Sequence, residues 1–356
     1  MVSISLSIIA KNEQKTLTIC LESAKNLVDE IIVVDTGSTD NTKEIALTYG
    51  AKVYDFDWQG DFAAARNFAL SKSSSDWNLV LDADERITSW DSDRLEEFTA
   101  SPHSIGRIKI ISSFTQNGEE RLAQDFISRL LPKGVLFKGR IHEQVDSNLP
   151  RIDIPIEVFH TGYYGTDKSE RNLQLLLKEM QENPNSPYIL YQLGRQYRNG
   201  KEINEAAMYL EKAYVYIIRS ERYAVDLIVN YLYILIELKL YLRALEIINN
   251  ERDWLNRSAD FHFVCGIFYM NYVMNDPVQN LHYLKEVEKS YLNCLELHSN
   301  SLEEIVVGTS SFLAAYNLGV FYETTGNHTN AKKFYLIAAN DSYTPAINRL
   351  IFLNKE

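Results

Sequence analysis

The chain has few cysteines, and they follow no pattern. Its 356 residues include only Cys20, Cys265 and Cys294, and no two of them have the C-x-x-C spacing of a zinc ribbon or a redox motif. Three scattered cysteines offer no disulfide framework either. We therefore expect three free thiols that pack in the hydrophobic core.

Positively charged residues are also fewer than negatively charged ones. The chain has 36 lysines and arginines against 48 aspartates and glutamates, which gives a formal net charge of -12. This balance argues against a nucleic-acid partner, because a phosphate backbone requires a basic surface. A local basic pocket for a single diphosphate remains compatible with it.

Long apolar runs are absent as well. No stretch approaches the roughly 18 to 20 apolar residues that span a bilayer. The opening segment, MVSISLSIIAKNE, lacks the basic region of a signal peptide and is typical of a strand. We expect a soluble, cytoplasmic protein.

A glycine-rich phosphate loop is missing too. The segment AKNEQKT, which follows the first expected strand, contains no glycine. A nucleotidyltransferase normally has such a loop near its N-terminus, so this class of enzyme is disfavoured.

The first half of the chain alternates short apolar strands with helices. Expected strands cover residues 3–10, 31–34, 51–56 and 77–82. Helical patterns lie between them, at residues 14–26, about 41–50 and 61–72. This alternation predicts an α/β, Rossmann-like domain with a mostly parallel sheet. Irregular twisted strands and loops are expected over residues 105–160.

The second half is helical throughout. From residue 166 the strands stop, and two stretches carry the spacing of tetratricopeptide (TPR) repeats, with small residues where paired helices touch. These positions are Leu193, Gly194, Tyr197, Ala206, Leu210 and Ala213, and again Leu318, Gly319, Tyr322, Ala331, Tyr335 and Ala338. Residues 223–251 and 259–297 are interpreted as degenerate helix pairs, with a loop at 274–279. We predict two domains, 1–165 and 166–356, the second an all-α solenoid of about four pairs; an unrelated helical bundle is the alternative.

Polar residues follow three of the predicted strands. They are Lys11-Asn12-Glu13, Asp35-Thr36-Gly37-Ser38 and Asp82-Ala83-Asp84. Ligands of parallel sheets bind at the carboxyl ends of the strands, so the three clusters are expected at one rim. The alternative for Asp35 and Ser38 is that they only cap the next helix.

The D-x-D pattern of Asp82 and Asp84 calls for a positive partner. Side chains alternate along a strand, so both carboxylates point to the same face, about 7 Å apart. A magnesium or manganese ion carried on a diphosphate would share their charge. His160 closes an apolar run and is a candidate for a further metal ligand, although a hydrogen-bonded structural histidine is the alternative.

Four motifs, in order, resemble the donor half of family 2 glycosyltransferases with the GT-A fold. They are SLSIIAKNE, EIIVVDTGSTDNTKEIA, DFDWQGDFAAARNFAL and WNLVLDADE. The resemblance covers roughly residues 1–165. It implies an inverting transfer of a sugar from a nucleotide-sugar, usually a UDP-sugar, with a divalent metal.

The resemblance also assigns expected roles. Asp35 would meet the nucleobase, Asp82 the ribose and metal region, and Asp84 the metal itself. The diphosphate and sugar side would be lined by Asp61, Arg66 and Asn67, although Arg66 could equally be a solvated helix residue. The donor site so implied further includes Ala10, Asn12, Glu13, Ser38 and Ala83.

The segments FKGRIHEQ and VFHTGYY, followed by helical repeats, are similar to the sublancin-type enzymes that glycosylate cysteine in glycocin bacteriocin peptides. That similarity implies a peptide acceptor, UDP-glucose as donor and a homodimer. The acidic pair that usually supplies the catalytic base is not found, so Glu143 is the first candidate and His142 the second. A thiol acceptor would need less help from a base, because cysteine is partly ionised near neutrality.

Two alternatives stay open at this point. Other repeat-bearing family 2 enzymes act on cell-surface polysaccharide or on lipid-linked acceptors. In another class, the chain would be a repeat scaffold with an inactive sugar-binding domain. Intact Asp35, Arg66, Asp82 and Asp84 favour an active enzyme.

Overall fold

The computed structural model describes residues 2–116, 119–160, 169–297 and 304–353. The chain divides into two compact units, Met1–Gln181 and Glu182–Glu356. The domain boundary predicted between residues 165 and 166 lies outside the described residues, and helix α5 (Ser169–Glu182) follows it.

The first unit begins with the alternation that the sequence predicts. Its strands are β1 (Ile4–Ala10), β2 (Glu30–Asp35), β3 (Lys52–Asp55) and β4 (Trp77–Asp82), and its helices are α1 (Leu17–Ala24), α2 (Thr42–Thr48) and α3 (Phe62–Lys72). The apolar runs of β1, β2 and β4 are buried almost throughout, as expected of strands covered on both faces. Helix α1 buries one stripe of residues three and four apart against this sheet.

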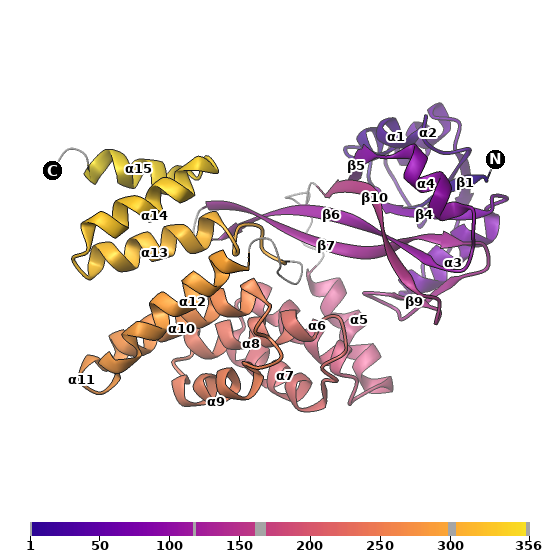
Figure 1. Cartoon of the computed structure of the whole chain (residues 1–356). Helices are drawn as coiled ribbons and strands as arrows, with labels where there is room; N and C mark the ends of the chain where they lie inside the picture. The colour runs from indigo at the N-terminus through magenta and orange to yellow at the C-terminus, as the bar shows by residue number, and fades with distance from the viewer. Residues whose placement is uncertain (1, 117–118, 161–168, 298–303, 354–356) are drawn as a thin grey trace. The chain divides into compact units, whose positions relative to one another are not determined.

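The remaining elements of this unit complete a mixed sheet. They are β5 (Glu85–Trp90), α4 (Ser92–Thr99), β6 (Ile105–Gln116), β7 (Glu119–Pro132), β8 (Leu136–Lys138), β9 (Gln144–Asp146) and β10 (Arg151–His160). Eight strands form one sheet in the order β3-β2-β1-β4-β7-β6-β10-β5, and β8 pairs with β9. Figure 1 shows β6 and β7 as two long strands that run side by side. The predicted α/β class is confirmed, but the sheet is less parallel than expected because β7 pairs antiparallel with both β4 and β6.

The register of the parallel strands aligns their carboxyl ends. Ala10 of β1 lies opposite Asp35 of β2, and Ile9 lies opposite Asp82 of β4. On the other side of the sheet, His160 of β10 pairs with Glu85 of β5. The residues that follow these strands are therefore brought to one rim.

The second unit consists of helices that follow one another as pairs (Figure 1). The pairs are α6 (Pro187–Asn199) with α7 (Ile203–Tyr216), α8 (Ala224–Glu237) with α9 (Tyr241–Glu251), α10 (Ala259–Asn275) with α12 (Leu284–Glu296), and α13 (Phe312–Thr324) with α14 (His328–Asn340), followed by α15 (Thr344–Leu353). Four pairs were predicted, and four are found within the described residues. The loop predicted at 274–279 is wrong for most of its length, because α10 continues to Asn275 and a short helix α11 covers Pro277–Asn280.

Close helix contacts explain the small residues of the repeat pattern. A Cβ atom added to Gly319 would lie 2.6 Å from the ring of Tyr335, and one added to Gly194 would lie 2.5 Å from the side chain of Leu210. Both partners belong to the predicted pattern. Gly266 approaches Tyr291 in the same way in the third pair, where the sequence spacing is less regular.

Two further features of the fold are the state of its cysteines and the hydropathy of its helices. Cys20, Cys265 and Cys294 are all free and buried, as predicted. Within the part of the chain that the structure describes, no helix is both long and apolar enough to cross a membrane.

Candidate functional site

The loop after β2 surrounds a buried carboxylate, that of Asp35. One of its oxygens, Oδ1, accepts hydrogen bonds from the backbone N–H groups of Gly37 (3.0 Å) and Ser38 (2.8 Å). Gly37 has a φ of 104°, a left-handed conformation that glycine adopts without strain. The other oxygen, Oδ2, is buried and has no hydrogen-bond partner in the described residues. One oxygen of Asp35 therefore stabilises the turn of its own loop, and the other can accept a hydrogen bond from a ligand.

The loop after β1 is bonded to the loop after β2. The Asn12 backbone N–H donates to Ser38 Oγ (2.9 Å), and Asn12 Oδ1 accepts from the backbone of Thr39 (2.8 Å). Asn12 adopts a left-handed φ of 57°, which asparagine tolerates better than most residues. The Ala10 carbonyl accepts the backbone N–H of Thr36, and the Glu13 backbone N–H donates to Thr42 Oγ1. The structure thus brings together five of the residues predicted for the nucleotide-sugar site: Ala10, Asn12, Glu13, Asp35 and Ser38.

Two arginines hold Asp82 at the end of β4. Its Oδ1 accepts from Arg66 Nη2 at 2.6 Å, and its Oδ2 accepts from Arg129 Nη2 at 2.9 Å. Burial acts to raise the pKa of Asp82, but the two guanidiniums outweigh it and hold this pKa well below its usual range. The positive partner that the D-x-D pattern requires is therefore present for Asp82 in the protein itself.

Arg129 is the main residue that sequence reasoning missed. It lies in β7, is only 8% exposed, and also approaches Glu85 Oε1 at 3.5 Å. The available signal was its setting: Arg129 lies among the apolar residues Ile127, Leu130 and Leu131 of one strand, where an arginine requires a buried partner.

Glu85 is buried directly beneath this arginine pair. Its Oε2 accepts the backbone N–H of Asp82 at 2.8 Å. Burial raises the pKa of Glu85 to about 7; Arg129 opposes this shift, and the neighbouring Asp82 adds to it. Glu85 was not predicted as a site residue, although it belongs to the same DADE segment.

Glu143 lies against the other side of Arg66. Arg66 Nε donates to Glu143 Oε1, so one buried guanidinium joins Glu143 to Asp82. Burial alone would raise the pKa of Glu143, but Arg66 outweighs it and lowers this pKa. Its neighbour His142 has a left-handed φ of 50°, and the His142 carbonyl accepts from Gln144. Glu143 is thus linked to the D-x-D segment through Arg66, whereas the side chain of His142, the second candidate base, is exposed.

Asp84 meets His160 across the sheet. His160 Nε2 lies 3.3 Å from Asp84 Oδ2, and its Nδ1 lies 3.4 Å from Ser112 Oγ. The hydrogen bond to Asp84 raises the pKa of His160, against the effect of burial. Ala83, between the two aspartates, is buried, which keeps this turn close to the sheet.

The remaining predicted donor-site residues lie on α3 and bond to the backbone. Asp61 caps the helix by accepting from Ala64 N at 2.9 Å. The Asn67 carboxamide both donates to the Phe137 carbonyl and accepts its N–H, which holds β8 against α3. The described structure therefore gives both residues a positioning role, and their contact with a donor stays a prediction.

The donor atoms at this rim suit a metal ion that arrives with phosphate. Within the described ranges, no group of three or more His, Cys, Asp or Glu side chains is arranged to hold a metal ion. Asp84 and His160 nevertheless offer a carboxylate oxygen and an imidazole nitrogen 3.3 Å apart. Magnesium typically takes one or two carboxylates and completes its shell with phosphate oxygens and water. The pair therefore fits such an ion, whereas both oxygens of Asp82 are already bonded to arginines.

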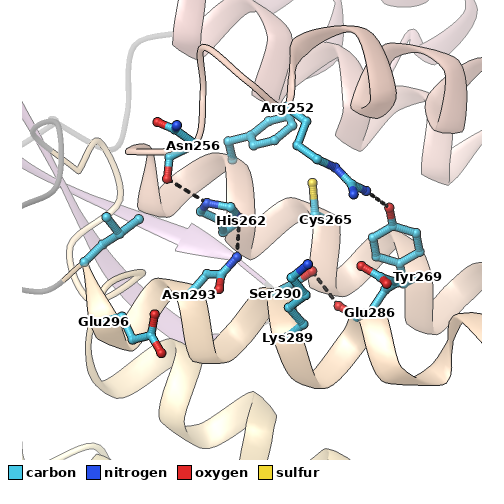
Figure 2. A pocket seen from close by; sticks show the side chains of 12 residues that line it. Arg252, Asn256, His262, Cys265, Tyr269, Glu286, Lys289, Ser290, Asn293 and Glu296 are labelled. Atoms are coloured by element: carbon cyan, nitrogen blue, oxygen red, sulfur yellow. Dashed lines mark hydrogen bonds between the residues drawn. The ribbon is translucent and has the colours of Figure 1, made fainter.

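A cavity lies in the helical unit, between α10, α12 and the end of α9. It has a volume of about 280 Å³, and Figure 2 shows Arg252 at one end and Asn256 at the other. On its floor, His262 Nε2 lies 3.0 Å from the Asn256 carbonyl and Nδ1 lies 3.4 Å from Asn293 Nδ2. Arg252 donates to the Tyr269 hydroxyl at 2.7 Å. Burial and the nearby cations Arg252 and Lys289 lower the pKa of His262, which favours the neutral imidazole.

Comparison with known proteins finds one matching family and several similar proteins. The model of the family described as Glycosyl transferase family 2 matches residues 5–171. A TPR repeat-containing protein of Synechococcus elongatus is 35% identical over 213 residues, which cover 54% of this chain and 52% of that protein. The SPbeta prophage-derived glycosyltransferase SunS of Bacillus subtilis is 28% identical over 224 residues, which cover 59% of this chain and 53% of that protein.

The chain thus spans about half the length of these curated relatives. Among solved structures, the TPR protein YrrB, described as having an unusual peptide-binding site, covers 51% of this chain and 84% of its own length. It is 19% identical to this chain, with a TM-score of 0.38.

Proposed function

On the premise that this chain carries a family 2 glycosyltransferase domain at residues 5–171, we propose that it transfers a sugar from a nucleotide-sugar to an acceptor with inversion at the anomeric carbon. UDP-glucose is the first donor to test. The observation that carries the proposal is the meeting of Asp82, Asp84 and His160 at the rim where the Asp35 loop also lies. The likeness to the glycosyltransferase SunS supports it.

The Asp35 loop suits the nucleobase. A buried carboxylate oxygen without a donor is costly, because its lost hydration is not repaid by a hydrogen bond. A nucleobase that presents a ring N–H, as uracil does, would supply the missing donor to Asp35 Oδ2. The bonded loops of Asn12 and Ser38 would then form the wall of this pocket.

The diphosphate belongs at the D-x-D end of the site. A divalent ion, when bound by Asp84 and His160, would neutralise charge on the leaving diphosphate. The described residues place four carboxylates (Asp82, Asp84, Glu85 and Glu143) around two guanidiniums and one imidazole. A dication would balance that excess of negative charge.

The transfer itself requires a nucleophile and a base. The acceptor atom attacks the anomeric carbon, its proton passes to a base, and the bond from that carbon to the diphosphate oxygen breaks with release of the nucleoside diphosphate. Glu143 and His142 are the candidate bases, and the Arg66 ion pair makes Glu143 a weak one. A cysteine thiol needs less assistance than a serine hydroxyl, so we favour a cysteine of a peptide as acceptor.

The helical unit would hold the acceptor. Stacked helix pairs offer extended surfaces, and their common role is to bind peptides or partner proteins. A bacteriocin-type peptide bound by a cytoplasmic homodimer is the specific form of this proposal. The cell-surface polysaccharide and lipid-linked acceptors remain the alternatives that an acceptor assay would separate from it.

Donor hydrolysis tests the proposal directly. UDP- and GDP-sugars would be incubated with manganese or magnesium, with the wild type beside Asp84→Ala. We expect slow, metal-dependent release of UDP that is lost in Asp84→Ala, followed by a search for the modified peptide by mass spectrometry. Absence of turnover, together with absence of metal-dependent nucleotide binding, would leave the repeats as the functional part of the chain.

A further inference from the structure

Arg129 has no place in the function proposed above, yet it is one of the most buried charged residues of the site. Its guanidinium bonds Asp82 Oδ2 at 2.9 Å and lies 3.5 Å from Glu85. Strand β7 fixes its position, because Leu130 and Leu131 beside it pair with Leu79 and Asn78 of β4. The arginine is therefore held beside the end of β4 by the sheet itself.

The two arginines occupy both oxygens of Asp82. Arg66 bonds Oδ1 from α3, and Arg129 bonds Oδ2 from β7. A dication at Asp82 would have to share an oxygen with a guanidinium or displace it, and it would meet the repulsion of both positive charges. The two carboxylates of the D-x-D segment therefore differ in their surroundings. Asp82 is bonded to two arginines, whereas Asp84 lies beside His160.

We propose that Arg129 is a positioning residue that keeps Asp82 out of the metal's coordination shell. This inference rests on the proposed metal- and nucleotide-sugar-dependent function. With Asp82 blocked, the protein alone offers the metal the Asp84 and His160 pair, and phosphate oxygens of the donor supply further ligands. Arg129 thereby makes strong metal binding depend on the donor, and it leaves Asp82 oriented for the donor rather than for the ion.

A purely structural role for Arg129 predicts something different. If Arg129 only neutralised Asp82 and Glu85, its loss would destabilise the unit and weaken every ligand. If Arg129 blocks Asp82, its loss frees a carboxylate oxygen near Asp84, and the metal alone should bind more tightly while donor turnover falls. The two roles thus move metal affinity in opposite directions.

The experiment measures equilibrium binding of Mn²⁺ alone by titration calorimetry, with no donor present. We expect Arg129→Gln to bind Mn²⁺ roughly five- to tenfold more tightly than the wild type, because one repulsive charge is lost and one carboxylate is gained. Arg129→Lys, which keeps the charge, should remain within about twofold of the wild type. Adding Asp84→Asn to Arg129→Gln should abolish the gain.

Arg107→Gln is the matched control. Arg107 is another partly buried arginine of the same unit, and its ion pair is with Asp153 on β10 rather than with the D-x-D segment. It should leave Mn²⁺ binding unchanged. Equal tightening in Arg107→Gln, or no tightening in a folded Arg129→Gln, would overturn the inference.

Asp82→Asn provides a second route if Arg129→Gln does not fold. A blocked Asp82 contributes no metal ligand, so Asp82→Asn should keep Mn²⁺ affinity within about twofold, whereas Asp84→Asn should lose it. Equal losses in the two variants would contradict the inference while leaving a metal-dependent enzyme. Absence of Mn²⁺ binding by the wild type, even with UDP, would instead overturn the proposed function and this inference with it.

Discussion

The two units both bury carboxylates, but they neutralise them differently. In the helical unit, Glu251 and Glu323 each have their own arginine and their own tyrosine hydroxyl as partners. Glu251 accepts from the Tyr214 hydroxyl at 2.6 Å and from Arg219 at 2.5 Å. Glu323 accepts from the Tyr335 hydroxyl at 2.7 Å and from Arg349 Nε at 2.8 Å. These hydrogen bonds join neighbouring helices, and in both cases the charge of the carboxylate is matched by that of an arginine.

The α/β unit leaves its polar groups incomplete. There, three carboxylates (Asp82, Glu85 and Glu143) share Arg66 and Arg129 at the rim of the sheet. Within the described residues, every buried side-chain nitrogen or oxygen that lacks a hydrogen bond belongs to this unit, Asp35 Oδ2 and Arg66 Nη1 among them. A complete network stabilises a fold, whereas an incomplete one has capacity for a ligand. The contrast separates structural from functional charge without reference to any relative.

Neutralising one carboxylate of the rim tests this difference between the two units most directly. We expect Asp84→Asn to reduce metal-dependent donor hydrolysis at least about 100-fold, because the ion loses its charged ligand. Its thermal unfolding midpoint should stay close to that of the wild type, since no buried network depends on it alone. A donor-hydrolysis assay checks the loss of activity, and calorimetry on the same preparation checks the unfolding midpoint. A lowered midpoint with hydrolysis intact would place Asp84 among the structural carboxylates.

Glu251→Gln should show the opposite behaviour. Glu251 is 2% exposed and also accepts from Trp254 Nε1, so an amide would turn a donor toward other donors. We expect a loss of about 2 kcal/mol in the free energy of unfolding, because Arg219 is partly exposed and the penalty is reduced by solvent. Donor hydrolysis should persist. Glu246→Gln, at an exposed carboxylate of the same helix, is the control and should change neither.

Local patterns predicted the parts of the site that lie on single segments. The Asp82 and Asp84 spacing, the Asp35 loop and the repeat glycines are all visible over a few residues, and the family model confirms the resemblance to family 2 enzymes. The sequence also predicted that a positive group would meet the D-x-D carboxylates. It proposed a metal for both, whereas the structure provides Asp82 with two arginines.

Arg129 could not be placed because its role depends on non-local pairing. It lies 47 residues from Asp82 in the chain and reaches it only because β7 pairs with β4. No local signal states which strand will be a neighbour in a mixed sheet, and antiparallel insertion of β7 between β4 and β6 was not anticipated. Likewise, the link from Arg66 to Glu143 joins residues 77 positions apart.

The helical unit offers a test of packing alone. In Gly194→Ala, the new Cβ would lie 2.5 Å from the Leu210 side chain, so α6 and α7 must move apart. We expect a loss of about 1 to 2 kcal/mol, since overpacking outweighs the better helix propensity of alanine. Gly200→Ala, at the end of the same helix with an ordinary φ of -73°, is the control and should be close to neutral. Urea denaturation of both variants measures the difference, and equal stabilities would argue against close helix contact at Gly194.

The smallest expected effect is a pH dependence at Asp260. This carboxyl is 3% exposed and accepts from the backbone of Ile305 and Val306 and from Thr309, yet burial outweighs these bonds and raises its pKa from 3.8 to about 6. The protonated form therefore contributes stability that is fully present below pH 3.8 and lost as the pH rises through about 6. Relative to Asp260→Asn, the wild type should lose about 1 kcal/mol in the free energy of unfolding between pH 5.5 and 7. Urea denaturation at both pH values provides the comparison. A constant difference between the two proteins would mean that the hydrogen bonds, and not burial, control the pKa of Asp260.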